Sequence, residues 1–349
     1  MKRSYLIFTV ALAVAALLSL GWAQPGSTAG PYKITKTAKV GGDGGFDYVY
    51  ADVAGRRLYV PRSGPTARIT VFDLDTLEPV GEIQNVSGHG VVVDSKTHHG
   101  FLTSKPVVMF DTNTLSVIKT IEVQGNPDGI FFDASTERVY DLSHSAPNAT
   151  VIDAKDGSIV GTIDLGGAPE QATSDGNGHV YIDVEDKGSI AVVDAKTLQV
   201  TAHYDLRGKG GTCAGLAVDA KNRILFSTCR NPQTMVILSA DDGKILETLP
   251  IGAASDGALF NPATMEAFSS NSDGTLTIVK ENSRTSFVVE QSLNTMPSAK
   301  TSTLDGKTNR ILLIAAAFEA PPPGTTLGNG RIARGPMVPG SFSILTVAK

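Results

Sequence analysis

Cysteine, tryptophan and aromatic residues in general are scarce in this sequence. Its 349 residues include two cysteines and one tryptophan, and 6% of them are aromatic. Two cysteines are too few for a four-thiolate zinc site, and no C-x-x-C-H motif for covalent haem is present. A G-x-S-x-G nucleophile elbow is also absent. The sequence therefore predicts neither covalent haem chemistry, nor a cysteine-based zinc site, nor the common serine-hydrolase arrangement.

Clusters of basic residues are missing as well. The chain holds 30 lysine and arginine residues against 35 acidic ones, and its formal net charge is −5. Proteins that bind nucleic acid need a basic surface that follows the phosphate backbone, so we expect no nucleic acid partner. The glycine-rich stretch from Gly41 to Gly45 is not followed by a helical pattern, and a phosphate-binding loop is therefore not predicted either.

Only one hydrophobic run is long, and it lies at the N-terminus. An uncharged run from Tyr5 to Leu20 follows Lys2 and Arg3, and small residues precede a cleavage point after Ala23. This is the pattern of a secretory signal peptide over residues 1–23. An uncleaved anchor is the alternative, but a membrane-spanning helix needs about 20 apolar residues. We expect a periplasmic or extracellular protein with no membrane span after cleavage.

The two cysteines, Cys213 and Cys229, are predicted to form a disulfide. Export would place them in an oxidising compartment. Cys213 opens one apolar run and Cys229 closes the next, with the turn between them centred near Lys221. In a hairpin of antiparallel strands this spacing sets the two residues opposite each other. The alternative is two independent small residues of the core.

A single unit is repeated along the rest of the chain. Each copy has a short apolar run that ends in Asp or Asn, a turn, an aliphatic or aromatic strand, a V-x-D-type strand and a return strand. The first run of the successive copies ends at Asp52, Asp94, Asp133, Asp175, Asp219, Asn261 and Asp305. These positions lie 39 to 44 residues apart, which is the length of one four-stranded propeller blade. The segments are of strand length and bounded by turn formers.

We therefore predict an all-β, seven-bladed β-propeller with four-stranded blades over residues 32–349, preceded by a linker over residues 24–31. The seventh copy has three strands, and residues 32–40 carry the pattern of a fourth. We expect this N-terminal strand to complete the last blade, which would leave no open sheet edge there. Blade seven also carries an insertion of about residues 318–340, which is rich in glycine and proline.

The repeats resemble the YVTN-type repeat family of secreted bacterial propellers. The shared motifs are Pro127-Asp128-Gly129 at a strand entry, Arg57-Leu58-Tyr59-Val60 in a second strand and Val71-Phe72-Asp73-Leu74-Asp75-Thr76 at a third-strand turn. The resemblance covers residues 32–349 and implies the fold, not an activity. Blade six departs from the pattern because Lys280 replaces the third-strand Asp.

Ionisable residues recur at one register of the inner strands. Five residues before each strand-final Asp or Asn stand Asp47, His89, Asp128, Glu170, Ala214, Asp256 and Lys300. Inner strands of a propeller converge on a central channel, so these side chains are expected at one mouth. Carboxylates crowded there repel one another unless they are protonated, hydrated or bridged by a cation. The register predicts either a ligand site, with one divalent metal ion as a candidate cofactor, or a hydrated lining.

Two further groups of residues are expected on the same face. The ends of the second strands contribute Arg62, Lys105, His144, Glu185, Arg230 and Asn271. The insertion contributes Arg331 and Arg334, which could reach an anionic ligand above the carboxylates or lie free of the channel. The other histidines, His98, His99, His179 and His203, fall in turns or on outer strands.

These observations leave the activity open, and they do not decide whether the protein is an enzyme. The first hypothesis is a monomeric binding or scaffold protein whose channel face holds a small molecule, a glycan or a protein. The alternative is a divalent-metal-dependent hydrolase or lactonase, with Asp128, Glu170, Asp256 and His89 as ligands and Asp47 as general base. A third possibility, an accessory partner of a redox enzyme, rests on analogy alone.

Overall fold

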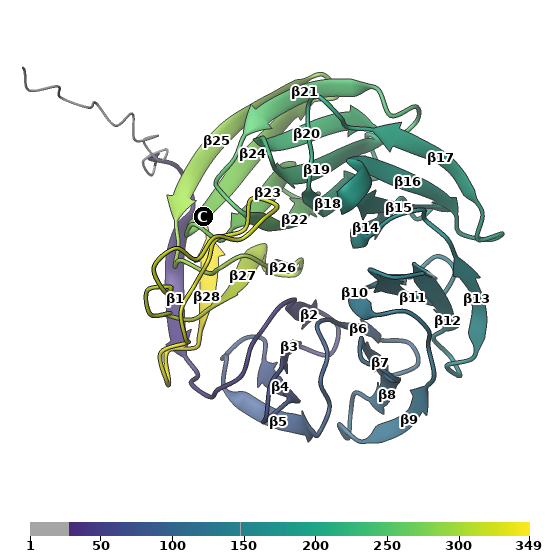
Figure 1. Cartoon of the computed structure of the whole chain (residues 1–349), viewed down its shortest axis with the longest axis vertical. Coiled ribbons are helices and arrows are strands. Elements are labelled where there is room, and N and C mark those ends of the chain that lie inside the picture. Colours follow the sequence, from purple (N-terminus) through teal and green to yellow (C-terminus); the bar gives the residue numbers. More distant parts are fainter. Residues whose placement is uncertain (1–27, 147) are drawn as a thin grey trace, which may run out of the picture.

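The computed structural model describes residues 28–146 and 148–349, and the predicted signal peptide lies outside the described residues. Within them the chain forms seven antiparallel four-stranded sheets arranged as blades around a central axis (Figure 1). One short 3₁₀ helix, η1 (Glu185–Lys187), interrupts the strands. No helix in the described part of the chain is long and apolar enough to cross a membrane. The prediction of an all-β, seven-bladed propeller is confirmed.

In every blade except the seventh, the strands follow one another from the axis outward in chain order. Blade one consists of β2 (Tyr50–Asp52), β3 (Arg57–Arg62), β4 (Arg68–Asp73) and β5 (Pro79–Gln84). Blade two consists of β6 (Val91–Asp94), β7 (His99–Leu102), β8 (Val107–Asp111) and β9 (Val117–Ile121). Blade three consists of β10 (Pro127–Asp133), β11 (Arg138–Ser143), β12 (Ala149–Asp153) and β13 (Ile159–Ile163). Blade four consists of β14 (Pro169–Ser174), β15 (His179–Val184), β16 (Ser189–Asp194) and β17 (Val200–Asp205). Blade five consists of β18 (Cys213–Asp219), β19 (Ile224–Arg230), β20 (Gln233–Ser239) and β21 (Ile245–Pro250). Blade six consists of β22 (Ser255–Asn261), β23 (Glu266–Asn271), β24 (Thr275–Ser283) and β25 (Ser286–Asn294).

Blade seven joins the two ends of the propeller. It consists of β26 (Ser302–Asp305), β27 (Arg310–Ala315), β28 (Ser343–Ala348) and, outermost, β1 (Lys33–Lys39). The N-terminal strand runs antiparallel to β28, with Lys33 opposite Ala348 and Lys39 opposite Ser343. Strand β1 therefore covers the edge of β28, as the repeat pattern predicted.

The D-x-x-T-L sequence explains the repeated turn between third and fourth strands. In blade one the Asp73 carboxylate accepts hydrogen bonds from the backbone amides of Asp75 and Thr76, at 3.0 and 2.7 Å. Leu77 then adopts a left-handed conformation, with φ of 62°. The side chain of the Asp thus replaces backbone bonding in a tight turn. Where Lys280 stands instead, β24 and β25 each continue to nine residues before the chain turns.

The hydrophobic core lies between blades. One cluster joins Leu58 and Phe72 of blade one to Leu312 and Ile344 of blade seven, and equivalent clusters lie between other neighbouring blades. Each sheet is therefore buried on both faces, which accounts for the almost continuous apolar runs of the second and third strands. The outermost strands are more exposed, and β17 alternates between partly buried and exposed residues.

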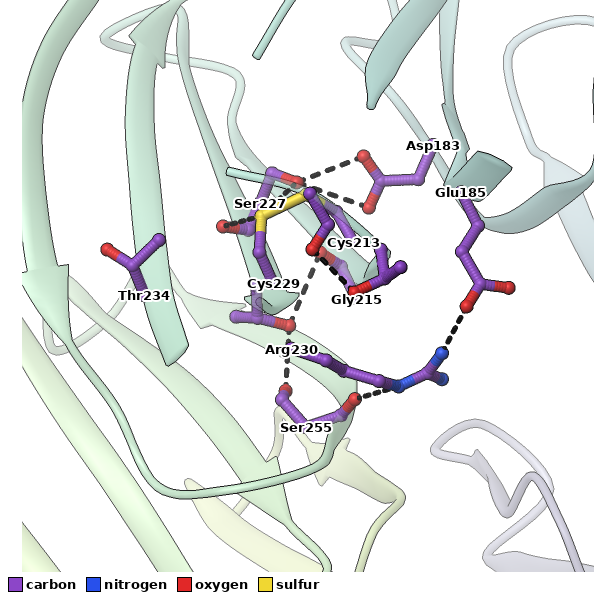
Figure 2. The surroundings of a disulfide bond; sticks show 12 residues. Asp183, Glu185, Cys213, Gly215, Ser227, Cys229, Arg230, Thr234 and Ser255 are labelled. Carbon is purple, nitrogen blue, oxygen red and sulfur yellow. Dashed lines mark hydrogen bonds and ion pairs between the residues drawn. A yellow bond between two sulfur atoms is a disulfide. The ribbon is translucent and has the colours of Figure 1, made fainter. Parts of the chain in front are cut away.

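A disulfide links Cys213 of β18 to Cys229 of β19, as predicted. The two residues are cross-strand partners at the channel end of blade five (Figure 2). Cys229 directly precedes Arg230, so the cross-link holds the end of the strand that carries this arginine.

Replacing both cysteines with serine is expected to lower the free energy of unfolding by about 3 kcal/mol, because a cross-link across 16 residues restricts the unfolded chain. Urea unfolding of the oxidised protein and of the C213S/C229S variant measures the difference. Wild-type protein reduced with dithiothreitol serves as the control and should match the variant. Equal midpoints for all three samples would contradict a stabilising cross-link.

Candidate functional site

β-Bulges place the charged side chains at the channel mouth. Asp128, Glu170 and Asp256 are each the second residue of an inner strand. In each of these strands the pairing with the next strand shifts register at this point. A bulge turns a side chain out of the regular alternation. Ala214 occupies the same bulged position in blade five, so blade five has no polar side chain at this position.

On one side of the mouth, acidic and basic groups form a continuous row. The Lys300 ammonium lies 2.7 Å from an Asp47 oxygen, and the other Asp47 oxygen lies 3.0 Å from Nδ1 of His89. The same His89 nitrogen is 3.2 Å from Asp128 Oδ1. His144 Nε2 approaches Asp128 Oδ2, also at 3.2 Å. His144, which the sequence placed only on the surrounding face, thus belongs to the row itself.

On the other side, Arg230 joins two carboxylates. Its guanidinium pairs with Asp256. It also pairs with Glu185, and its Nε donates to the Ser255 carbonyl at 3.0 Å (Figure 2). Asp256 also pairs with Lys300. The Arg230 side chain is 1% exposed, so these are buried charge pairs whose members depend on one another.

The insertion of blade seven closes the row. Arg331 lies 3.5 Å from Glu170 Oε1 and 3.9 Å from Glu185 Oε2. A Cβ added to Gly330 would lie 2.9 Å from Cβ of Arg230, so this part of the loop packs on blade five. Arg334 lies over the ring of Phe318.

Together these contacts form a closed row in which acids alternate with bases. We call it the mouth cluster; in order it consists of Lys300, Asp47, His89, Asp128, His144, Glu170, Arg331, Glu185, Arg230 and Asp256. Five carboxylates in it face three lysine or arginine cations. The surplus of negative charge lies on the side of the two histidines.

All members of the mouth cluster except Glu185 line a cavity of about 360 Å³. Polar groups that the sequence did not single out also line it, namely Tyr48, Asn126 and Ser272, together with Leu327 and Ile332 from the insertion. A second cavity of about 320 Å³ lies between the inner strands. Tyr48 and Glu170 border both.

Burial and neighbouring charges separate the pKa values of the carboxyl groups. Burial opposes ionisation of Asp47, but Lys300 and His89 outweigh it and lower the pKa of Asp47 to about 2. Burial, the carboxylate of Glu185 and that of Asp256 raise the pKa of Glu170 well above its ordinary value. Burial and the Asp47 charge raise the pKa of Asp128. The hydrogen bond to Asp47 raises the pKa of the His89 imidazole, against the effect of burial.

Two sets of three side chains could hold a metal ion. Asp47, His89 and Asp128 form one set, and Asp128, His144 and Glu170 form the other. In each set the ligand atoms lie within 4.8 Å of one another. Both sets combine imidazole with carboxylate oxygen, a combination that suits zinc and other first-row transition metals.

Three of the residues expected on this face do not line the mouth cavity. Arg62 is buried over the ring of Phe342, with its guanidinium carbon 3.7 Å from the ring centre. Lys105 donates to the Gly125 carbonyl at 2.7 Å. Asn271 bonds within blade six.

The likeness to known proteins covers the fold. No protein-family model matches the chain. It is 22% identical over 193 residues to the uncharacterized protein YncE of Salmonella typhi, and equally to that of Salmonella typhimurium. The match covers 53% of this chain and 54% of each relative, so the chain spans about half the length of the curated relatives it matches.

Solved propellers superpose on nearly the whole molecule. The WD40 repeats of RRP9 match with a TM-score of 0.69 and 10% identity, over 92% of this chain and 100% of that chain. A chain of the mitotic checkpoint complex matches with a TM-score of 0.67 and 10% identity, over 90% and 96%. Likeness at this level of identity shows the architecture and leaves function to the site.

Proposed function

We propose that the protein is a binding protein of the periplasm or cell exterior that holds a small polar molecule at its channel mouth. The observation that carries the proposal is the mouth cluster, in which charged groups from all seven blades, together with the insertion, line a single cavity of about 360 Å³. Small-molecule sites fall in this range of volume and use a few convergent polar groups. A free small molecule, or one sugar unit of a glycan, fits this volume better than a protein surface does.

The arrangement of charges favours a ligand with both donors and acceptors. Lys300 and Arg230 are occupied by carboxylates of the cluster. The His89 side chain is 48% exposed and that of Arg331 is 50% exposed, so these two retain free capacity. A zwitterion such as an amino acid, or a hydroxyl-rich sugar, would find both kinds of partner at this mouth.

The location and the family are part of the proposal. The leader-like pattern of residues 1–23 supports export, and the disulfide is compatible with an oxidising compartment. The similarity to YncE and the Y-V and V-x-D-x-x-T motifs support membership of the YVTN-type repeat family.

A ligand panel tests the binding proposal. Chelator-treated protein is screened by thermal shift and saturation-transfer NMR against the free amino acids, common hexoses and small hydroxy acids. We expect at least one hit that is weakened about tenfold, equivalent to about 1.4 kcal/mol, by Asp128→Asn. The matched control is Glu137→Gln, a turn residue of blade three paired with Lys96 away from the mouth. A panel without hits, or hits that Asp128→Asn leaves unchanged, would overturn the proposal.

Metal-dependent hydrolysis is the second candidate, and the two sets of metal-ligating side chains favour it. Asp256 is engaged by Lys300 and Arg230, so His144 replaces it in the ligand set expected from the sequence. A bound divalent ion would polarise an ester carbonyl or a water molecule. Turnover of lactone or aryl-ester substrates that depends on added metal would support this candidate over simple binding.

A further inference from the structure

Glu170 carries an oxygen that lacks a partner. The residue is 4% exposed, lines the mouth cavity, and its Oε1 atom has no hydrogen-bond donor among the described residues. A buried carboxylate oxygen without a donor is costly for a folded protein. The nearest basic side chains are Arg331 at 3.5 Å and His144 at 3.8 Å, and neither donates a hydrogen bond to this oxygen.

The two halves of the cluster differ in how far their carboxylates are neutralised. Asp47 has a close fixed cation in Lys300, at 2.7 Å. Among the described residues, the basic side chains within 4 Å of the Asp128 carboxylate are the imidazoles of His89 and His144. The cation deficit of the mouth therefore lies at Asp128 and Glu170, which share His144 as a neighbour.

We propose that Asp128, His144 and Glu170 bind one divalent first-row transition-metal ion, of which zinc is the test case. The set supplies one imidazole nitrogen and two carboxylate oxygens, and its ligand atoms already lie within 4.8 Å of one another. Three protein ligands facing a cavity leave a coordination position open to water or to a ligand. The inference deepens the proposed function, since it assigns the metal to the same cavity, but it does not require the small molecule to be identified.

Arg331 is the competitor of this ion. Its guanidinium approaches Glu170 and Glu185 from the insertion, and the side chain is half-exposed. A divalent ion at Glu170 and the Arg331 cation would repel each other across the same carboxylate. Metal binding should therefore displace Arg331, and removal of its charge should strengthen metal binding.

Calorimetric titration of the purified, chelator-treated protein with zinc chloride tests the proposal. We expect about one equivalent bound. Glu170→Gln and His144→Ala should each weaken zinc binding by about tenfold or more. Losing a residue that only supports a metal ligand already weakens metal binding by about tenfold, and losing a ligand itself should cost at least as much. Arg331→Ala should tighten binding, whereas Glu137→Gln should leave it unchanged. Circular dichroism spectra verify that each variant is folded.

Cobalt substitution supplies a readout of the ligands themselves. The visible absorption of bound Co²⁺ should be present in the wild type and change when His144 is replaced. Absence of saturable zinc binding, or zinc binding that is equal in wild type, E170Q and R331A, overturns the proposal. The ligand panel uses chelator-treated protein, so the two proposals can fail separately. Ligand hits without zinc binding would refute the metal site alone. Zinc binding without ligand hits would refute the small-molecule proposal alone.

Discussion

Replacing Arg230 with methionine is expected to lower the free energy of unfolding by about 3 to 5 kcal/mol, the range for breaking a buried ion pair from one side. The side chain is 1% exposed and pairs with Asp256 and Glu185. Methionine would fill the space of the aliphatic stem but leave both carboxylates facing each other without this cation. Asp256 retains Lys300, whereas Glu185 retains only Arg331 at 3.9 Å.

Urea unfolding with the disulfide intact measures the effect, and two further variants make it specific. Arg223→Met removes an arginine of the same blade that pairs with Asp175 and Asp241 but is 29% exposed; it should cost about 1 kcal/mol or less. Adding Glu185→Gln to Arg230→Met should restore part of the loss, because one of the stranded charges is removed. Equal losses for Arg230 and Arg223 would show that burial of the pair does not matter.

The repeat was enough to predict the blades, since every blade carries the same turn chemistry and alternation. The strand-final residues Asp52, Asp133 and Asn261 do end inner strands. The closure of blade seven by residues 33–39 could be predicted for the same reason: the segment has the pattern of a fourth strand, and one blade lacked one.

The register of the inner strands was enough to group the residues of the mouth cluster that come from those strands. For the ends of the second strands, the exact distance from the cross-strand partner of the strand-final residue decides which side chains reach the mouth. Arg230 lies six residues after Ile224, the partner of strand-final Asp219. Arg62 lies only five residues after Arg57, the corresponding partner in blade one. Because side chains alternate along a strand, a difference of one residue turns the two arginines to opposite faces of their sheets. Arg62 consequently packs on Phe342, whereas Arg230 reaches the mouth.

The same count holds for other members of the site, although Lys105, which also lies six residues after the partner of its strand-final residue, bonds to the Gly125 carbonyl and does not line the cavity. His144, Ser272 and Glu185 each lie six residues after the first residue of the second strand of their blade. His144 and Ser272 line the cavity, and Glu185 pairs with Arg230. Asn271 lies five residues after Glu266, the corresponding partner in blade six, and bonds within its own blade. The position of the insertion could not be predicted, because glycine and proline in a long loop carry no periodicity that fixes what Leu327 and Ile332 will contact.

A buried carboxyl group also lies outside the mouth, in blade three. Asp141 is fully buried in β11, and neither of its carboxylate oxygens has a hydrogen-bond donor among the described residues. The equivalent residue is Val60 in blade one and Ile182 in blade four, as the cross-strand pairings show. Burial raises the pKa of Asp141 to about 8. A repeat position that is valine in blade one, isoleucine in blade four and serine in blades five and six thus holds a carboxyl whose neutral form is favoured by burial.

Replacing Asp141 with valine is therefore expected to stabilise the protein in a pH-dependent way. The pKa of an aspartate in the unfolded chain is about 3.9, so the folded state binds the proton more tightly. The wild type should hence lose stability as pH rises from about 4 to about 8, by about 4 to 5 kcal/mol from this group, while the valine variant has no such loss. The advantage of the variant over the wild type should grow across this window and then level off above the folded pKa.

Urea unfolding of both proteins at pH 5, 6, 7 and 8 measures the difference in their free energies of unfolding. Subtracting the wild-type value from that of the variant at each pH cancels the titration of the groups that the two proteins share. Glu137→Gln, an exposed carboxylate of the same blade, is the control and should give a difference that is small and flat with pH. An advantage of Asp141→Val that is flat from pH 5 to 8 would mean that the carboxylate is solvated or paired in the folded protein. A difference that grows with pH would instead identify Asp141 as an ionisable group buried at the expense of stability, which is the mark of a residue retained for another reason.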